Sequence, residues 1–449
     1  MKIAIIGAGA AGCFAAANIT PRDGLKVTVF EKTGKVLQKV KVSGGGRCNV
    51  THECFDIPEL LTRYPRGKQL LRKSLYHFTP ADTIKWFEER GVQLKTEADG
   101  RMFPITDSSQ TIIDAIWQEM MRKGVQVIYH KSVNSIEKDG AQFVITFADG
   151  STYTADKVLI STGGFPKAEQ YKWLTAMGHT IQQPVPSLFT FNIPKHPVTE
   201  LMGLSVPMAT VKIAGTKIAQ SGPLLITHWG MSGPAVLKTS AVGARELADR
   251  NYQFNFIINW LNDVNDADLK EIILGLRQEQ GKQLVQNKNP FELPRRLWEY
   301  LLIQCGIKDD VRWGELPAAQ QNKLIEALLR NTYTVNGKTT FKEEFVTCGG
   351  INLAEIDPQT MQSKLHPGLH FAGEVMDVDG VTGGYNFQNA WSSGWIAAQS
   401  MGQFDNLAVG YLSYVSNNNK SGSLRGTKQS HERTCSFCIS KIPLCKQIT

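Results

Sequence analysis

Hydrophobic residues at the start of the chain follow the pattern of a strand, a glycine turn and a helix. The stretch KIAIIGAGAAGCFAAANI begins at Lys2, is broken by TPRDG, and is followed by a second apolar run, KVTVF, which leads to Glu31. A strand made of consecutive apolar residues is covered on both faces, as in the parallel sheet of an α/β protein. The N-terminal residues therefore predict a β–α–β unit.

Downstream patterns predict a mixture of amphipathic helices and short strands. Thr79 is a suitable N-cap for the first of these helices, Pro80 fits its first turn, and Gly91 ends it. Asp-Gly pairs at 139–140 and 149–150 separate alternating β-runs, as hairpin turns do. In order, the predicted elements are helices 79–91 and 109–123, β-runs 125–129, 132–138 and 142–148, and a buried strand at 157–164.

The pattern changes after Pro184, where proline-punctuated β-runs continue to about Ile226. Residues 233–248 and about 263–331 are mostly helical in pattern. Asn336-Gly337 predicts a hairpin within Tyr333–Thr340.

The glycine-rich strand pattern returns at FVTCGGINL and leads to a final helix at about 387–401. We therefore expect a discontinuous nucleotide-binding domain, residues 1–187 and 349–415, around an inserted domain, residues 188–348. The remaining residues, 416–449, are polar and lack periodicity, which predicts a disordered tail.

Composition and charge place the chain among ordinary globular proteins. Its 449 residues are 42% hydrophobic and 20% charged, and the formal net charge is +8. Six basic residues and one acidic residue fall in 416–449, which leaves only +3 for residues 1–415. The body of the chain therefore gives no reason to expect nucleic-acid binding.

Membrane insertion and secretion are not expected either. The N-terminal apolar run contains three glycines and leads directly into a second strand, so it does not read as a signal peptide. No later apolar stretch is long enough to cross a bilayer. Eight cysteines without a secretory signal indicate reduced thiols and a cytoplasmic protein.

The first glycine turn has the chemistry of a dinucleotide site. Gly7, Gly9 and Gly12 form a G-x-G-x-x-G turn that allows a tight bend, close approach of a pyrophosphate, and close helix–strand packing. The helix that follows would direct its N-terminal N–H groups at the phosphates. Glu31, 19 residues after Gly12, can accept the hydroxyls of an adenosine ribose and would repel a 2′-phosphate.

The end of the chain favours a flavin dinucleotide over NAD. An NAD domain would continue with alternating helices and strands, whereas this chain inserts SGGGRCN, β-hairpins and STGG. A late strand ends in Ala372-Gly373-Glu374, which could place a carboxylate at a second polyol, and Gly383-Gly384 could open a helix toward a ring. FAD has such a second polyol, the ribitol of the flavin half, and NAD does not.

Four motifs together resemble those of the BaiN/RdsA-type bacterial NAD(P)/FAD-dependent oxidoreductases, flavoproteins with a glutathione-reductase-type FAD domain. They are KVSGGGRCNVT (41–51), GRMFP (100–104), THWGMSGPAVL (227–237) and the long run CGGINLAEIDPQTMQSKLHPGLHFAGEVMDVDGVTGGYNFQNAWSSG (348–394). The resemblance covers nearly all of residues 1–403. It implies an α/β fold with a discontinuous Rossmann-like FAD domain and an inserted β-barrel-like and helical domain.

The resemblance also implies which residues contact the cofactor. Those expected at the adenosine diphosphate half are Gly7, Gly9, Ala10, Ala11, Gly12, Glu31, Lys32 and, through its backbone, Val133. Those expected along the pyrophosphate and the flavin are Ser43, Gly44, Gly45, Gly46, Arg47, Cys48, Asn49, Thr162, Gly163 and Gly164. Those expected around the ribitol and the ring are Gly373, Glu374, Asp377, Gly384, Tyr385, Asn386 and Gln388.

Flavin disulfide reductases are a rival class that the cysteine spacing disfavours. Their redox-active cysteines have four residues between them, whereas Cys48 and Cys54 have five. On a helix this spacing places the two side chains about 120° apart, which is poor for a bridge. No second G-x-G-x-x-G follows a strand within residues 100–350. We expect Cys48 to be a small residue beside the flavin rather than a redox group.

Candidate catalytic residues are fewer. Arg47 is either a structural ion-pair partner or a cation that balances the pyrophosphate or the reduced flavin, and we favour the second interpretation. His228 precedes a glycine-rich turn and is a candidate acid or base, although a lone histidine is more often structural. Tyr385 could donate a proton to substrate or pack on the ring. Cys435, Cys438 and Cys445 near His431 have partial metal-ligand spacing, and we assign no metal.

The expected function is FAD-dependent oxidation–reduction of a small organic substrate. Reduced nicotinamide would bind transiently and deliver hydride to the flavin. On the family resemblance alone, the preferred acceptor is a carbon–carbon double bond activated by a carbonyl. An oxidase that uses dioxygen is the alternative among enzymes. A flavin-binding sensor or RNA-associated protein, with the basic tail as its contact, is the non-enzymatic alternative.

Overall fold

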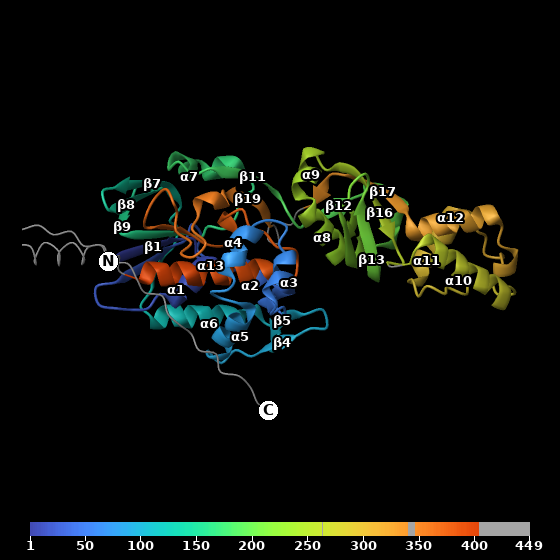
Figure 1. Ribbon diagram of the computed structural model, residues 1–449, viewed down its shortest axis with the longest axis horizontal. Coiled ribbons are helices and arrows are strands. Elements are labelled where there is room, and N and C mark those ends of the chain that lie inside the picture. Colours follow the sequence, from blue (N-terminus) through green and yellow to red (C-terminus); the bar gives the residue numbers. More distant parts are fainter. Residues whose placement is uncertain (263, 340–345, 404–449) are drawn as a thin grey trace, which may run out of the picture. The chain divides into compact units, whose positions relative to one another are not determined.

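A five-stranded parallel sheet forms the centre of the first part of the fold (Figure 1). The structure is a computed structural model, and it describes residues 1–262, 264–339 and 346–403. The strand order is β20-β10-β1-β2-β6, and every neighbouring pair is parallel. The strands are β1 (Lys2–Ile6), β2 (Lys26–Phe30), β6 (Gln126–Ile128), β10 (Lys157–Ile160) and β20 (Leu369–Phe371). The predicted N-terminal β–α–β unit is therefore confirmed.

Three helices pack together beside this sheet. Helix α1 (Ala10–Asn18) contacts both α13 (Tyr385–Gly402) and α6 (Ser109–Arg122). Phe14 on α1 is fully buried, with its ring centroid 5.0 Å from that of Trp391 on α13. The two ends of the described chain thus share one core, as a discontinuous domain requires.

Two small antiparallel sheets and several helices accompany the parallel sheet. One short sheet is made of β3 (Thr51–His52), β5 (Arg101–Pro104) and β4 (Leu94–Thr96). A separate three-stranded meander is made of β7 (Val133–Asp139), β8 (Gln142–Phe147) and β9 (Thr152–Ala155). Four helices lie between β2 and β4 in the chain: α2 (Gln38–Gly46), α3 (Ile57–Thr62), α4 (Lys68–Ser74) and α5 (Pro80–Glu88). Helix α7 (Lys172–Ala176) follows β10. The antiparallel pair β11 (Ile181–Pro186) and β19 (Thr347–Ile351) joins the chain on either side of the insertion.

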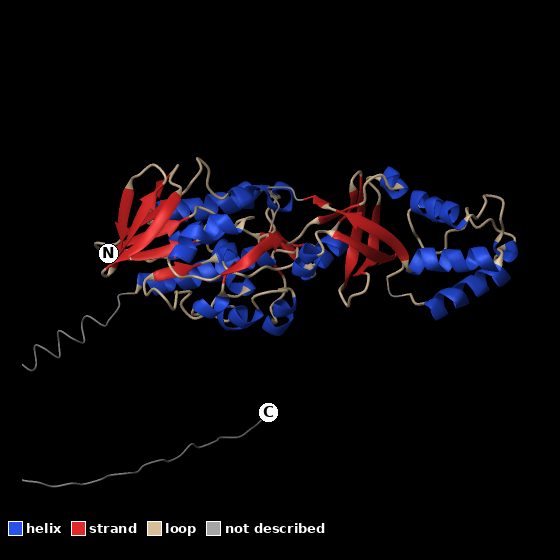
Figure 2. Ribbon diagram, turned by 90° about the horizontal axis from the view of Figure 1, so that it is seen from above, coloured by secondary structure: helices blue, strands red, loops and turns tan. Residues whose placement is uncertain are grey.

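The insertion contains a seven-stranded antiparallel sheet of order β17-β16-β13-β14-β15-β12-β18 (Figure 2). Its strands are β12 (Thr190–Asn192), β13 (Ser205–Ile213), β14 (Ala219–Thr227), β15 (Gly230–Ser232), β16 (Gln253–Asn259), β17 (Asn331–Asn336) and β18 (Lys338–Thr339). The predicted hairpin at Asn336-Gly337 is wrong, because β17 pairs with β16 whereas β18 pairs with β12. Gly337 carries the chain directly from one edge strand to the other, which closes the sheet into the expected barrel-like form.

Helices complete the insertion. Pattern alone predicts one helix at 233–248, but the structure has α8 (Pro234–Val242) and α9 (Ala244–Asp249), separated at Gly243. Three further helices, α10 (Asp266–Glu279), α11 (Arg295–Cys305) and α12 (Ala318–Leu329), occupy the region predicted to be mostly helical. Strand β16 is missing from the predicted elements, although its sequence alternates between polar and buried apolar residues at its start.

Two hydrophobic cores are present in the described residues. The first is built from residues before 189 and after 350, together with Ala241, and the second from residues 189–335. Fully buried aromatic side chains anchor both cores, among them Trp391 in the first and Trp298 in the second. The exact domain bounds stay a prediction, and residues 404–415, the tail 416–449 and its cysteines lie outside the described residues.

No helix in the described part of the chain is both long enough and apolar enough to span a bilayer.

Candidate functional site

The turn between β1 and α1 leaves open space at one glycine and none at the other two. Gly7 has a φ of 106°, and a Cβ there would lie 2.6 Å from the carbonyl oxygen of Ser161. A Cβ on Gly12 would lie 2.1 Å from the carbonyl oxygen of Gly7, whereas one on Gly9 would have no atom within 4 Å. Gly9 is the N-cap residue of α1, and no side chain in the described residues accepts a hydrogen bond from the first N–H groups of the helix there. The helix N-terminus, where Ala10 begins α1, is therefore accessible to a phosphate.

Glu31 is held in place at the end of β2. It is buried, and its carboxylate accepts hydrogen bonds from the backbone N–H of Ala8 at 3.0 Å and of Thr33 at 2.9 Å. The Thr33 hydroxyl donates a third, at 2.9 Å. These bonds fix the carboxylate beside the glycine turn and leave acceptor capacity for ribose hydroxyls.

The chain beyond β6 runs close to Glu31. The N–H of Lys131 donates to the carbonyl oxygen of Glu31 at 2.9 Å, and Val133 begins β7 two residues later. Lys32 is exposed, with its ammonium 5.8 Å from the ring centroid of Phe165. The structure therefore brings Lys32 and the backbone of Val133 to the same edge as Glu31.

The triple glycine lies in a kink at the end of α2. Gly44, Gly45 and Gly46 have φ values of 58°, 68° and 86°, a left-handed conformation that only glycine adopts readily. A Cβ on Gly44 would lie 2.9 Å from the ring of Phe103, but Cβ atoms on Gly45 and Gly46 would meet nothing within 4 Å. The kink, which starts at Ser43, thus presents exposed backbone that a cofactor could approach.

The residues after the glycines face the protein rather than the open side. Arg47 forms an ion pair with Glu97 at 2.6 Å, and its guanidinium lies 4.1 Å from the ring centroid of Phe103. Cys48 is fully buried, and burial raises the pKa of its thiol to about 12. Such a thiol is protonated and unreactive at neutral pH. Cys48 and Cys54 are both free.

Asn49 links the triple-glycine kink to the turn that precedes α13. In the orientation that satisfies both amide atoms, its nitrogen donates to the carbonyl of Thr51 at 3.0 Å and its oxygen accepts from the N–H of Gly384 at 2.9 Å. A Cβ on Gly384 would lie 2.5 Å from the same Thr51 carbonyl. Two motifs more than 300 residues apart in sequence are therefore adjacent in the structure.

Glu374 lies where the STGG turn and the late strand meet. Its carboxylate accepts from Lys39 at 2.7 Å and from the backbone N–H of Thr347 at 2.8 Å. A Cβ on Gly164 would lie 3.1 Å from this carboxylate, and one on Gly163 would lie 3.9 Å from it. Glu374 thus lies beside Gly163 and Gly164, and it carries an ion pair with a lysine that the sequence did not point to.

Two further glycine-turn residues have packing roles. Gly373 has a φ of 74°, and a Cβ on it would lie 2.9 Å from the Cβ of Ala11 on α1. Thr162 donates its hydroxyl to the carbonyl of Gly163 at 3.2 Å. Gly373 therefore allows close packing on α1, and the Thr162 hydroxyl is already bonded to the protein backbone.

Two aspartates before α13 are paired with arginines. Asp377 accepts from Arg245 at 3.0 Å and 3.2 Å, and burial raises the pKa of its carboxyl. Asp379 is fully buried, bonded by two nitrogens of Arg66 and by the Ser187 hydroxyl at 2.7 Å. Sequence analysis singled out Asp377 but missed Asp379 and both arginines. The alternation of aspartates in MDVDG was the available signal for Asp379.

The first residues of α13 are engaged mainly with protein atoms. The amide of Asn386 bonds the N–H and the carbonyl of Gly380 at 2.8 Å and 2.9 Å, which shapes the loop before the helix. Gln388 is fully buried and accepts from the hydroxyls of Thr51 at 2.6 Å and Thr83 at 3.0 Å. These two side chains therefore position the loop and the helix.

Tyr385 stands at the beginning of α13, directly after the glycine turn. Its ring stacks on that of His52, with centroids 4.9 Å apart and planes at 19°. Burial raises the pKa of its hydroxyl, so the group stays protonated. The other candidate acid, His228, is exposed in the turn between β14 and β15, where its ring contacts Trp229. The contacts found for His228 in the described residues include none with the glycine turns.

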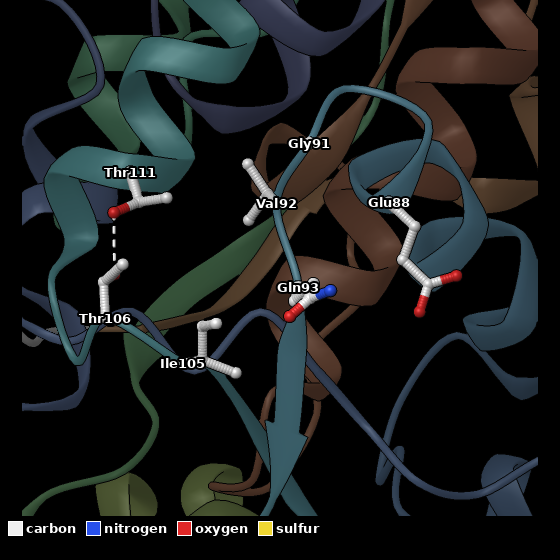
Figure 3. Close-up of a pocket in the computed structure, with 7 residues that line it drawn as sticks. All are labelled: Glu88, Gly91, Val92, Gln93, Ile105, Thr106 and Thr111. Atoms are coloured by element: carbon white, nitrogen blue, oxygen red, sulfur yellow. Dashed lines mark hydrogen bonds between the residues drawn. The ribbon is translucent and has the colours of Figure 1, made fainter.

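One surface pocket lies away from the predicted site residues and is lined by few ionisable or nucleophilic side chains (Figure 3). It lies beside α5 and the start of α6, and the hydroxyls of Thr106 and Thr111 in its wall bond each other at 2.7 Å. Glu88 is its one acidic lining residue. None of the predicted site residues lines it. In the described residues no three histidine, cysteine or acidic side chains gather as metal ligands.

Comparison with known proteins gives a family match and similar relatives. The family model described as HI0933-like protein Rossmann domain matches residues 1–400. The ribosomal RNA dihydrouridine synthase of Escherichia coli is 32% identical over 406 residues, which are 88% of this chain and 97% of that protein. The 3-dehydro-bile acid delta(4,6)-reductase of Clostridium scindens is 27% identical over 410 residues, 89% of this chain and 98% of that protein.

Solved structures with a similar fold are more distant. The 3-ketosteroid-delta4-(5alpha)-dehydrogenase of Rhodococcus jostii has a TM-score of 0.48 at 13% identity and covers 90% of this chain and 97% of its own. The quinol fumarate reductase FrdA of Escherichia coli has a TM-score of 0.45 at 14% identity, with 94% and 74% covered.

Proposed function

The chain belongs to the HI0933-like Rossmann-domain family, which contains FAD-dependent oxidoreductases, and we propose that it is an NAD(P)H-linked reductase. Its acceptor in this proposal is a carbon–carbon double bond conjugated to a carbonyl. When bound, FAD would supply the chemistry that the protein lacks, which is to take up a hydride from reduced nicotinamide and release it to the acceptor.

The arrangement of open and closed glycines is the observation that carries this proposal. Gly9, Gly45 and Gly46 leave space that a side chain would fill, while Gly7 and Gly12 bring α1 against the sheet. This is the pattern that a bound dinucleotide requires, because its phosphates must touch backbone. The residues expected along FAD in the sequence analysis, apart from Arg47, are proposed as its binding site.

Each group of residues has a defined task in this proposal. Glu31 holds the adenosine ribose, and the N-terminus of α1 holds the pyrophosphate. Glu374, with Gly163 and Gly164 beside it, holds the ribitol. Arg47 is assigned a structural task, since its partner Glu97 already neutralises it.

Reduced nicotinamide is proposed to bind transiently. The described residues contain one parallel sheet of Rossmann type, and the sheet of the insertion is antiparallel. A second dinucleotide-binding fold is therefore missing from this part of the chain, which favours a donor that enters the flavin site itself. An oxidase that reacts with dioxygen is the alternative, and the experiment below separates the two.

The names of two relatives support the choice of acceptor. Dihydrouridine is uridine with one ring carbon–carbon double bond saturated, and that bond is conjugated to a carbonyl. The delta(4,6) bonds of a 3-dehydro bile acid are likewise conjugated to its ketone. The reactions named for these two relatives thus involve a carbonyl-conjugated double bond in substrates of different size. This supports the same chemistry for this chain and does not identify its substrate.

A uridine within RNA is the second candidate acceptor, and one surface favours it. Helix α4 exposes Lys68, Arg72 and Lys73, and the exposed Tyr76 follows. Among the described residues these three cations have no ion-pair partner. Basic side chains next to an aromatic ring fit a single-stranded nucleic acid. The near-neutral body of the chain remains an argument for a small molecule.

The test is anaerobic reduction of the purified protein by NADH and by NADPH. The proposal predicts that FAD copurifies and that at least one of the two nicotinamides bleaches its visible absorbance. Failure of both to bleach it, with bleaching by an organic substrate and peroxide formed on readmission of air, would establish the oxidase instead. A chain purified without FAD, and unable to bind added FAD, would refute the proposal altogether.

A further inference from the structure

The GRMFP motif contains strand β5, and this strand is joined to the chain that follows the triple glycine. The N–H of Val50 donates to the carbonyl oxygen of Met102 at 2.9 Å, and Thr51 is paired with Met102 in the sheet. The motif comes more than fifty residues after the triple glycine in sequence, so the fold and not the local chain brings the two together.

Phe103, on β5, supports the start of the triple-glycine kink. Its side chain is fully buried, and a Cβ on Gly44 would lie 2.9 Å from its ring. Because the φ of Gly44 is 58°, a side chain there would be strained as well as too close to the ring. The N–H of Cys48 donates to the carbonyl of Ser43 at 3.0 Å, which closes a short loop of residues 44–47, the glycine loop. The ring of Phe103 therefore limits the position of one end of the glycine loop.

Arg47 fastens the other end of the glycine loop. Its guanidinium lies 4.1 Å from the centroid of the Phe103 ring, and its Nη1 atom forms an ion pair with Glu97 at 2.6 Å. Asp107, which follows β5, lies 3.5 Å from the same nitrogen. A planar guanidinium combines stacking on a ring with directed hydrogen bonds to acids. This side chain therefore ties the glycine loop to the sheet of β4 and β5.

A second arginine lies at the same ring but does not join the glycine loop to the sheet. Arg101 is on β5 itself, with its guanidinium 5.5 Å from the Phe103 centroid, and it pairs with Glu97 at 2.9 Å and with Asp99 at 2.7 Å. The ring and the two acids that its side chain contacts all belong to β5 or to the turn before it. Arg101 is thus a matched control for Arg47, with the same charge and a shared acidic partner.

Gly45 and Gly46 lie between the two ends held in this way. Both have left-handed φ values, 68° and 86°, and a Cβ on either would meet no atom within 4 Å. Glycine loses more conformational freedom than any other residue when its backbone is ordered. Contacts that order this backbone in advance lower the part of that loss that falls on ligand binding, and so they raise the affinity.

We propose that Arg47, Phe103 and Glu97 are positioning residues for FAD: they hold the glycine loop in the shape that the cofactor approaches and do not touch the cofactor themselves. The inference deepens the proposed function and rests on it. It replaces the interpretation in which the Arg47 cation balances the pyrophosphate or the reduced flavin. The charge of Arg47 serves its bond to Glu97, so loss of the acid should weaken cofactor binding as loss of the arginine does.

The experiment measures the dissociation constant for FAD at a temperature well below thermal unfolding. Purified holoprotein is diluted in steps, and the free FAD is separated by ultrafiltration and measured by its absorbance. Wild type is compared with Arg47→Gln, Glu97→Gln, Phe103→Leu and the control Arg101→Gln. The side chains of Arg47 and Glu97 are 34% and 27% exposed, so their substitutions leave the core intact even if Phe103→Leu fails to fold.

The proposal predicts that Arg47→Gln, Glu97→Gln and Phe103→Leu each weaken FAD binding about threefold to tenfold, because the glycine loop is no longer ordered in advance. Arg101→Gln stays within about twofold of wild type. The double variant Arg47→Gln/Phe103→Leu should lose less than the two single losses multiplied together, since both remove the same contact. A role limited to fold stability would lower the melting temperature and leave this dissociation constant unchanged.

Glu97→Gln separates positioning from direct contact with the cofactor. If Arg47 bound the pyrophosphate or the flavin, removal of its acidic partner would leave FAD binding unchanged or make it tighter. Unchanged or tighter binding in either Arg47→Gln or Glu97→Gln would therefore overturn the inference. An equal loss in Arg101→Gln would overturn it as well, because that side chain does not fasten the glycine loop.

Failure of the proposed function has a different signature. Wild-type protein that binds no FAD would refute the proposed function together with this inference. Failure of NADH and NADPH to reduce the bound flavin would refute only the choice of electron donor, because the dissociation constant is measured on oxidised protein.

Discussion

Gly45 combines a left-handed φ of 68° with empty space where a Cβ would point. Gly45→Val is therefore expected to lower the FAD content of the purified protein severalfold, because its side chain occupies the space proposed for the cofactor. The backbone strain of about 1–2 kcal/mol that a side chain adds at positive φ is a separate effect. Flavin content is measured from the ratio of visible to ultraviolet absorbance.

Gly178→Val is the matched control for that strain. Gly178 has a φ of 88° and open space at its Cβ, and it lies after α7. It should lose a similar amount of stability in a thermal melt and keep its flavin. Equal flavin content in the two variants would contradict the assignment of the triple-glycine kink to FAD.

Glu119 on α6 gives the clearest pH dependence at the scale of one residue. It is nearly buried, and the hydrogen bond from Arg122 at 2.8 Å is the largest cause that lowers its pKa from 4.5 to about 2. Because the folded-state pKa lies below the unfolded one, the stabilisation is complete above about pH 4.5 and is lost as the pH falls toward 2.

Glu119→Gln is expected to lower the free energy of unfolding at pH 7 by about 1–3 kcal/mol, a range that allows for the solvent exposure of Arg122. It should also flatten the dependence of that free energy on pH below 4.5. Glu88→Gln, an exposed acid on α5, serves as the control. Urea titrations at several pH values check this, and parallel curves for wild type and Glu119→Gln would show the prediction to be wrong.

At the scale of elements, Arg66 joins three segments that are far apart in sequence. Its guanidinium bonds Asp379 before α13, and it donates to the carbonyl of Ala241 near the end of α8 at 2.8 Å. Ser187, next to the predicted domain boundary, also bonds Asp379, at 2.7 Å. This one side chain therefore fixes the end of α8 relative to the loop before α13.

Removal of that cation is expected to be costly, because Asp379 is fully buried. Arg66→Gln should lower the free energy of unfolding by about 3–5 kcal/mol, and the added change Asp379→Asn should restore part of the loss. Arg72→Gln, an exposed arginine on α4, is the control and should change it by less than about 0.5 kcal/mol. If Arg66→Gln were no less stable than Arg72→Gln, the junction would not depend on this ion pair.

Elements whose signal is local could be predicted from sequence. Thr79 and Asp82 form the capping box that begins α5, and the G-x-G-x-x-G turn lies between β1 and α1 as expected. Contacts between distant segments could not be predicted. Nothing near Arg66 in sequence indicates Asp379, and a hairpin was expected at Gly337 because the local turn signal does not reveal which strands are partners.

The residues of the candidate site also fall into two groups, those with a local sequence signal and those whose role depends on contacts with distant segments. Gly9 and Glu31 could be placed beforehand because the strand–turn–helix frame fixes them. Arg47 was expected to face the cofactor, but the structure pairs it with Glu97, an acid fifty residues away.

For the whole molecule, the family and the two cores show that residues 1–403 hold the nucleotide fold and its insertion. One fold can serve different substrates when the residues around its site differ. The names of two relatives describe substrates as different as ribosomal RNA and a bile acid.

Reoxidation of the reduced protein by a carbonyl-conjugated alkene tests this account most directly. Holoprotein is reduced anaerobically with one equivalent of the effective nicotinamide and then mixed with a 3-oxo-Δ4-steroid, with a uridine-containing RNA, or with air-saturated buffer. The account predicts that one of the two alkenes restores the oxidised flavin spectrum faster than air and yields one saturated carbon–carbon bond per flavin. Rapid reoxidation by air alone, with peroxide and no saturated product from either alkene, would contradict it.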